Sequence, residues 1–115
     1  MPAPQLFGPY ALLSTNVGLA VAEKGRAGVY GLGRIGANGK FHALYVGRSE
    51  ADLAAALKRH IGEYGAFVFG YRSSPREAFH GECELYHLLE PEDNAAHPER
   101  PDGSDWRCPL CRLFN

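Results

Sequence analysis

The fold of this 115-residue chain is decided by residues 28–47, which read GVYGLGRIGANGKFHALYVG. Apolar and aromatic residues predict one strand beginning at Gly28 and a second over Phe41–Val46. Between them, the glycines and the asparagine of Gly36–Gly39 provide the residues that tight turns require. The segment is therefore predicted to form an antiparallel hairpin.

The residues after the hairpin predict a helix with Ser49 as its N-cap and Asp52 three positions later in a capping box. Apolar residues continue at helical spacing as far as Ile61, and Gly62 follows as a stop signal. The run from Ala66 to Tyr71 then predicts a third strand.

A second helix is predicted to begin at Ser73 or Ser74, with Pro75 at its first position, and to run to about Leu89. From Glu90 onward the chain is rich in Pro, Asp and Glu and is expected to be irregular. Near the N-terminus, residues 12–21 could form a short helix or an added strand.

These elements predict one α+β domain over residues 1–115, with a small three-stranded, mainly antiparallel sheet flanked by helices. The composition is that of a globular protein, with 45% hydrophobic and 22% charged residues. The apolar stretch over residues 11–22 is too short to span a bilayer, and no basic segment precedes it. We expect a soluble, cytoplasmic protein without a membrane partner.

Charge is unevenly distributed along the chain. Nine basic and three acidic residues lie between Lys24 and Arg76, whereas nine acidic residues and three arginines follow from Glu77 to the end. The basic part could attract a phosphate backbone, or both parts could simply be solvated surfaces. The three cysteines do not make the disulfide framework of a secreted protein.

Residues 31–36 match the dinucleotide-binding pattern G-x-G-x-x-G. That motif works only where its last glycine opens a helix that holds the pyrophosphate. Here a turn and a strand follow instead, so a nicotinamide cofactor is not expected.

Two tyrosine triplets lie on the hairpin, Gly28-Val29-Tyr30 and Tyr45-Val46-Gly47. Each triplet alone carries little information, because tyrosines are usually core or rim aromatics. They are followed in order by the first helix, a strand, the pair Glu77-Ala78, then Glu82 and Asn94. In this order and spacing, residues 28–94 resemble the catalytic core of the GIY-YIG nuclease family.

The resemblance implies a role for several residues. Glu82 would hold one Mg²⁺ (or Mn²⁺) near the scissile phosphate, Tyr30 would act as general base or position the attacking water, and Tyr45 would support it. Asn94 matches a family asparagine. Sequence-independent contacts with nucleic acid would come from Arg48, Lys58 and His60.

The chain departs from the family at the catalytic arginine of the first helix, where Ala56 stands. Arg59 lies three residues further on, nearly on the same helix face, and its long side chain could reach the site. The question of activity therefore depends on whether a cation replaces the missing arginine.

Cysteines and histidines suggest a second site. Cys83 and His87 share a helix face, and Cys108 and Cys111 have the spacing of a zinc knuckle, so these four predict a structural Zn²⁺ that fastens the tail over residues 95–115. His97 or His80 could replace one ligand. Alternatively, Cys83 is a buried small residue, His87 a surface residue and the two tail cysteines a redox pair. Trp106 is expected to be a packing anchor for the tail.

Two functions follow as hypotheses. The first is a metal-dependent endonuclease that cuts DNA or RNA. The second is a catalytically degenerate module that binds nucleic acid or a protein, with structural zinc only. In either case a second copy of the chain or a recruiting protein could supply specificity.

Overall fold

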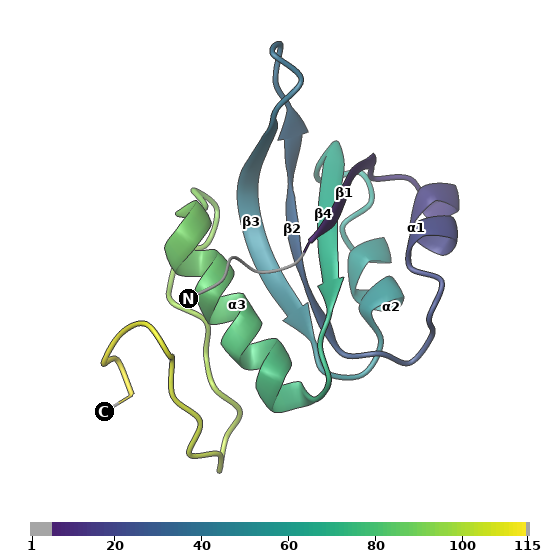
Figure 1. Cartoon of the computed structure of the whole chain (residues 1–115). Coiled ribbons are helices and arrows are strands. Elements are labelled where there is room, and N and C mark those ends of the chain that lie inside the picture. Colours follow the sequence, from purple (N-terminus) through teal and green to yellow (C-terminus); the bar gives the residue numbers. More distant parts are fainter. Residues whose placement is uncertain (1–5, 115) are drawn as a thin grey trace.

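The computed structural model describes residues 6–114 and places a four-stranded antiparallel sheet between helices (Figure 1). The order of the strands across the sheet is β1-β4-β2-β3. The α+β class predicted from the sequence is confirmed. In chain order the elements are β1 (Phe7–Ala11), α1 (Ser14–Ala20), β2 (Gly28–Ile35), β3 (Phe41–Ser49), α2 (Leu53–Lys58), β4 (Ala66–Tyr71) and α3 (Pro75–Leu89).

The predicted hairpin is formed by β2 and β3, which pair from Gly28 opposite Ser49 to Ile35 opposite Phe41. Its turn is closed by a hydrogen bond from the Gly36 amide to the Lys40 carbonyl at 2.8 Å. Gly39 has a φ of 78°, a conformation that favours glycine. The G-x-G-x-x-G stretch lies within β2 and this turn, and strand β3 follows it directly instead of a helix, as predicted.

The expected count of three strands was wrong, because β1 pairs antiparallel with β4 at the edge of the sheet. The ambiguous residues 12–21 contain helix α1, and the added strand lies before it. Every residue of β1 is exposed, and Phe7 and Tyr10 pack across the strands on Phe69 and Phe67, with ring centroids 5.4 and 5.5 Å apart. Such cross-strand packing leaves no local pattern in the sequence of β1.

The predicted N-cap of the first helix was also wrong. Strand β3 continues through Ser49, and Asp52 is the N-cap, accepting a hydrogen bond from the Ala55 amide at 3.2 Å. Ser49 instead accepts a hydrogen bond at its hydroxyl oxygen from the Asp52 amide at 2.9 Å, in the turn that leads into α2. Helix α3 is capped by Ser74 as predicted.

The sheet presents two faces because side chains alternate along its strands. On one face Tyr30 and Leu32 pack against α1 and α2. On the other face Val29 and Val46 pack against Leu85 of α3. Figure 1 shows the same arrangement, with α3 on one side of the sheet and the two short helices on the other.

The C-terminal tail runs beside α3 (Figure 1) and is held by a separate apolar cluster. Trp106 lies against Phe79 of α3 with ring centroids 6.0 Å apart, so it packs as predicted. Phe114 contacts the same ring at 6.0 Å. Among residues 6–114, none of the helices has the length and apolar character needed to cross a membrane.

Candidate functional site

Tyr30 of β2 and Tyr45 of β3 lie on the same face of the sheet, and His60 lies beside both. The centroid of the His60 ring is 5.8 Å from that of Tyr30 and 5.5 Å from that of Tyr45. The Tyr30 hydroxyl is 3.4 Å from His60 Nε2, and His60 Nδ1 is 2.9 Å from a carboxylate oxygen of Glu63. The result is a chain of polar contacts from Tyr30 through His60 to Glu63, a residue that the sequence reasoning missed.

Gly47 makes room for the Tyr30 ring. The two residues are directly opposite each other in the hairpin, and a Cβ atom at position 47 would lie 2.5 Å from the Tyr30 hydroxyl oxygen. The ring thus covers the glycine of the facing strand. This contact gives the final glycine of the second tyrosine triplet a physical reason.

The environment keeps both tyrosines neutral. Burial raises the pKa of Tyr30, the negative charge of Glu82 adds to the effect, and the charge of Arg59 opposes it. Burial also raises the pKa of Tyr45, again with a contribution from Glu82. Tyr30 therefore enters any reaction as a neutral hydroxyl rather than as a phenolate.

The raised pKa of Tyr30 predicts a loss of stability in alkali. Above pH 10.0, its ordinary pKa, the unfolded tyrosine loses its proton while the folded one retains it, so stability falls as the pH rises. The stability of the wild type relative to Tyr30→Phe should therefore decrease by about 1.4 kcal/mol between pH 9 and pH 11. Urea unfolding of both proteins at the two pH values measures this change. A difference that stays constant would show that the folded protein does not restrain ionisation of Tyr30.

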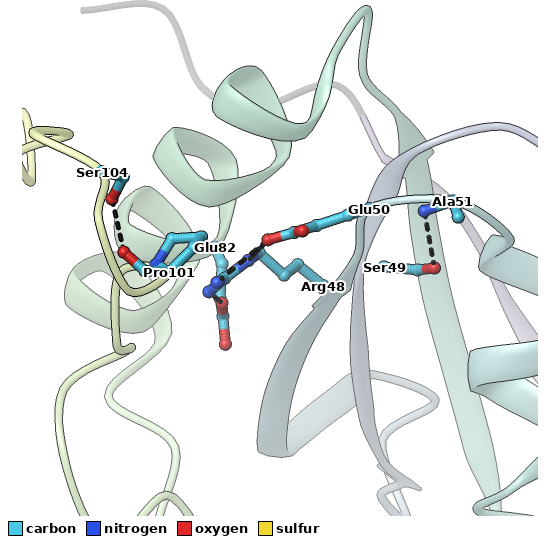
Figure 2. A network of polar contacts seen from close by, with 7 residues as sticks. All are labelled: Arg48, Ser49, Glu50, Ala51, Glu82, Pro101 and Ser104. Atoms are coloured by element: carbon cyan, nitrogen blue, oxygen red, sulfur yellow. Dashed lines mark hydrogen bonds and ion pairs between the residues drawn. The ribbon is translucent and has the colours of Figure 1, made fainter.

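Arg48 and Glu82 form a partly buried ion pair, with Arg48 Nη1 2.6 Å from Glu82 Oε1 (Figure 2). Glu82 is 8% exposed. Nη2 of the same guanidinium lies 3.3 Å from Glu50 Oε1, and its Cζ lies over the Phe79 ring, 5.2 Å from the ring centroid. Burial raises the pKa of Glu82, whereas the hydrogen bond and charge of Arg48 act in the opposite direction. In this structure, Arg48 contacts the carboxylate expected to bind the metal.

The predicted catalytic and nucleic-acid-binding residues are divided between the two faces of the hairpin. Arg48 is opposite Val29 in the register and lies with Glu82 on the α3 face, while the tyrosines lie on the α2 face. The groups remain electrostatically linked, because the charge of Glu82 raises the pKa of both tyrosines.

Asn94 has a structural contact with the edge strand. Its amide oxygen accepts a hydrogen bond from the Val46 amide at 2.8 Å, and its amide nitrogen donates one to the Val46 carbonyl at 3.0 Å. The neighbouring Asp93 amide donates to the Leu44 carbonyl at 2.7 Å. Both polar atoms of Asn94 are thus used to hold the chain after α3 against β3.

The cations of helix α2 are not equivalent to the missing arginine. Ala56, on α2, is only 6% exposed and belongs to the core cluster between the sheet and the two short helices. Lys58 is exposed in the last turn, and Arg59 is the exposed C-cap. Arg59 lies close enough to Tyr30 to oppose the rise of its pKa, so it is the cation of α2 that the structure connects with the tyrosines.

A second cluster joins α3 to the tail. One side-chain nitrogen or sulfur atom from each of four residues lies within 4.8 Å of all the others, and these residues are His87, His97, Cys108 and Cys111. This cluster could hold a metal ion such as zinc. Three of its members belong to the set predicted from the sequence.

Cys83, which the sequence predicted as a ligand, lies outside this cluster, and His97 is its fourth member. Cys83 is fully buried in the apolar cluster with Phe79 and Cys108. His97 lies in the tail, and the sequence predicted it only as one of two possible replacement ligands.

Comparisons with protein-family models, with curated proteins and with solved structures gave no match to this chain.

Proposed function

We propose that this protein is a cytoplasmic, metal-dependent endonuclease of the GIY-YIG type that hydrolyses phosphodiester bonds of DNA or RNA. The observation that carries the proposal is the burial of Glu82, a carboxylate with a raised pKa whose charge acts on both hairpin tyrosines. Perturbed ionisable groups of this kind concentrate at functional sites.

The donor chemistry at Glu82 fits a hard divalent cation. Mg²⁺ is typically held by one or two carboxylates together with waters and substrate phosphate oxygens. Glu82 would be the protein ligand for Mg²⁺ or Mn²⁺, which would supply positive charge for the phosphate and the leaving oxygen. Binding requires Arg48 to release the carboxylate, and Glu50 is already a second partner for its guanidinium.

Arg48 and Glu82 neutralise each other in the protein without substrate. A phosphodiester offers Arg48 a replacement anion, so substrate binding would favour the release of Glu82. Arg59 and Lys58 at the end of α2 would add sequence-independent attraction to the backbone. Specificity would come from a second copy of the chain or from a recruiting partner.

The polar chain on the other face of the hairpin supports proton transfer by neutral groups. Tyr30 would take a proton from the attacking water at its hydroxyl oxygen while its own proton passes to His60 Nε2. Glu63 accepts the Nδ1–H of His60, which fixes the required tautomer and stabilises the resulting imidazolium. This route avoids a phenolate, whose formation the raised pKa of Tyr30 disfavours.

A second candidate is a degenerate module that binds nucleic acid or a protein without cleaving. It is favoured by Ala56, whose buried side chain offers no charge, and by the contact of Arg48 with the carboxylate of Glu82. In this case the ion pair would be a permanent part of the core.

The two candidates are separated by a cleavage assay. Plasmid DNA and structured RNA are incubated with the protein in Mg²⁺, Mn²⁺ or EDTA, alongside Glu82→Gln and the control Glu84→Gln on the same helix. The nuclease predicts metal-dependent products, retained in the control and reduced on the order of 10²-fold or more in Glu82→Gln. Cleavage that persists in Glu82→Gln would overturn the mechanism, and binding without any cleavage would favour the degenerate module.

A further inference from the structure

We propose that His87, His97, Cys108 and Cys111 bind one Zn²⁺ in a closed, structural site that fastens the tail to α3. The proposal does not depend on the proposed nuclease activity, because none of the four residues belongs to the tyrosine chain or to the Arg48–Glu82 pair. It rests on the geometry of each ligand.

His87 provides the first argument. Its Nε2 atom is buried and lacks a hydrogen-bond partner among residues 6–114. A buried polar atom without a partner typically costs about 1–3 kcal/mol, so native proteins rarely leave one unsatisfied. Coordination of a metal ion by Nε2 would remove this penalty.

His97 is oriented as metal-binding histidines usually are. Its Nδ1 atom is 2.9 Å from the Pro98 carbonyl oxygen, which can only accept a hydrogen bond, so Nδ1 carries the proton. The lone pair is therefore on Nε2, which lies 3.5 Å from Cys111 Sγ. A backbone carbonyl on the far nitrogen is the usual outer contact of a zinc-bound imidazole.

Cys108 offers the ion a buried sulfur that already accepts a backbone hydrogen bond. The Leu110 amide donates a hydrogen bond to its sulfur at 3.4 Å, as the backbone of a Cys-x-x-Cys knuckle allows. Cys108 is 5% exposed, so a thiolate there would be shielded from solvent by the tail. A bound cation would balance its charge.

The separations fit one ion. Zinc bonds of about 2.0–2.3 Å in a tetrahedron place the ligand atoms about 3.3–3.8 Å apart. The four atoms here all lie within 4.8 Å of one another, so a small contraction completes the site. Four protein ligands of the S₂N₂ type leave no open position, which indicates a structural rather than a catalytic ion.

The tail has few other means of holding its position. Between residues 95 and 114 the structure contains no helix or strand, and Trp106 and Phe114 both pack on Phe79. Phe79 also lies beneath the guanidinium of Arg48. The ion would therefore order the tail and, through Phe79, support the surroundings of the Arg48–Glu82 pair.

The test compares the full chain with Cys111→Ser and His97→Ala, using Cys83→Ala and His80→Ala as controls because they change the one cysteine and one of the three histidines outside the cluster. All are purified under reducing conditions and their zinc content is measured. We expect one equivalent in the wild type and in both controls. Each ligand variant should lose zinc affinity by at least about 100-fold, since outer contacts alone typically contribute 10–100-fold.

Two further measurements use the wild type alone and therefore test the site even if a ligand variant does not fold. Replacement of zinc by Co²⁺ in the wild type should give the visible spectrum of a tetrahedral ion with thiolate ligands, and a chelator should make the tail sensitive to protease. Three results would overturn the proposal: a zinc-free wild type with freely reactive Cys108 and Cys111, a disulfide between them, or loss of zinc in Cys83→Ala but not in His97→Ala.

Discussion

Arg48→Met is expected to lower the free energy of unfolding by about 3–5 kcal/mol at neutral pH. The substitution keeps an apolar stem over Phe79 but leaves the 8% exposed carboxylate of Glu82 without its partner at 2.6 Å. An uncompensated buried charge is among the most destabilising changes in a protein core. Urea unfolding monitored by circular dichroism measures the loss, and Arg34→Met on the exposed end of β2 is the matched control.

Two further measurements define the origin of this loss. Adding Glu82→Leu to Arg48→Met should restore most of the stability, because apolar residues can replace a buried ion pair at little cost. The difference in the free energy of unfolding between the wild type and Arg48→Met should also become smaller as the pH falls. In the unfolded variant the Glu82 carboxyl has its ordinary pKa of 4.5, whereas burial raises its pKa in the folded variant. Between these two pKa values the folded state binds a proton that the unfolded state does not, so lowering the pH stabilises the folded state. A loss below about 1 kcal/mol, typical of surface pairs, would show that Glu82 does not depend on Arg48 for its stability in the core.

Tyr30→Phe is expected to reduce the rate of metal-dependent cleavage by about 10²–10⁴-fold, the usual contribution of a general acid–base group. The change removes the hydroxyl that contacts His60 at 3.4 Å but keeps the ring that packs over Gly47. The fold should therefore survive. Single-turnover cleavage of a labelled substrate at saturating protein separates this chemical effect from weaker binding.

Tyr10→Phe, on the exposed strand β1, is the matched control and should keep the full rate. His60→Gln should lower the rate as well, since it interrupts the path from Tyr30 to Glu63. If Tyr30→Phe cleaves within about threefold of the wild type, Tyr30 has no part in the proton transfer.

Much of the fold was accessible from the sequence because its signals are local. The Asn-Gly turn of the β2–β3 hairpin and the Ser74-Pro75 start of α3 both depend on a few adjacent residues. Strand β1 was missed because pairing with β4, and not its own pattern, determines it. The N-cap moved from Ser49 to Asp52 because pairing with Gly28 keeps Ser49 in the strand.

The candidate sites follow the same division. The sequence alone identified the candidate residues: two tyrosines on a hairpin, a glutamate on α3 and a Cys-x-x-Cys in the tail. Only the tertiary structure decided their partners, placing Arg48 on Glu82, Glu63 on His60 and His97 in the position expected for Cys83. Glu63 lies in the same turn as His60, but Arg48 and Glu82 are 34 residues apart and His97 and Cys111 are 14 apart, in segments whose relative positions depend on packing. Residue type and spacing encode chemical capability and local geometry, whereas burial and the choice of partner arise only when the sheet and its helices pack together.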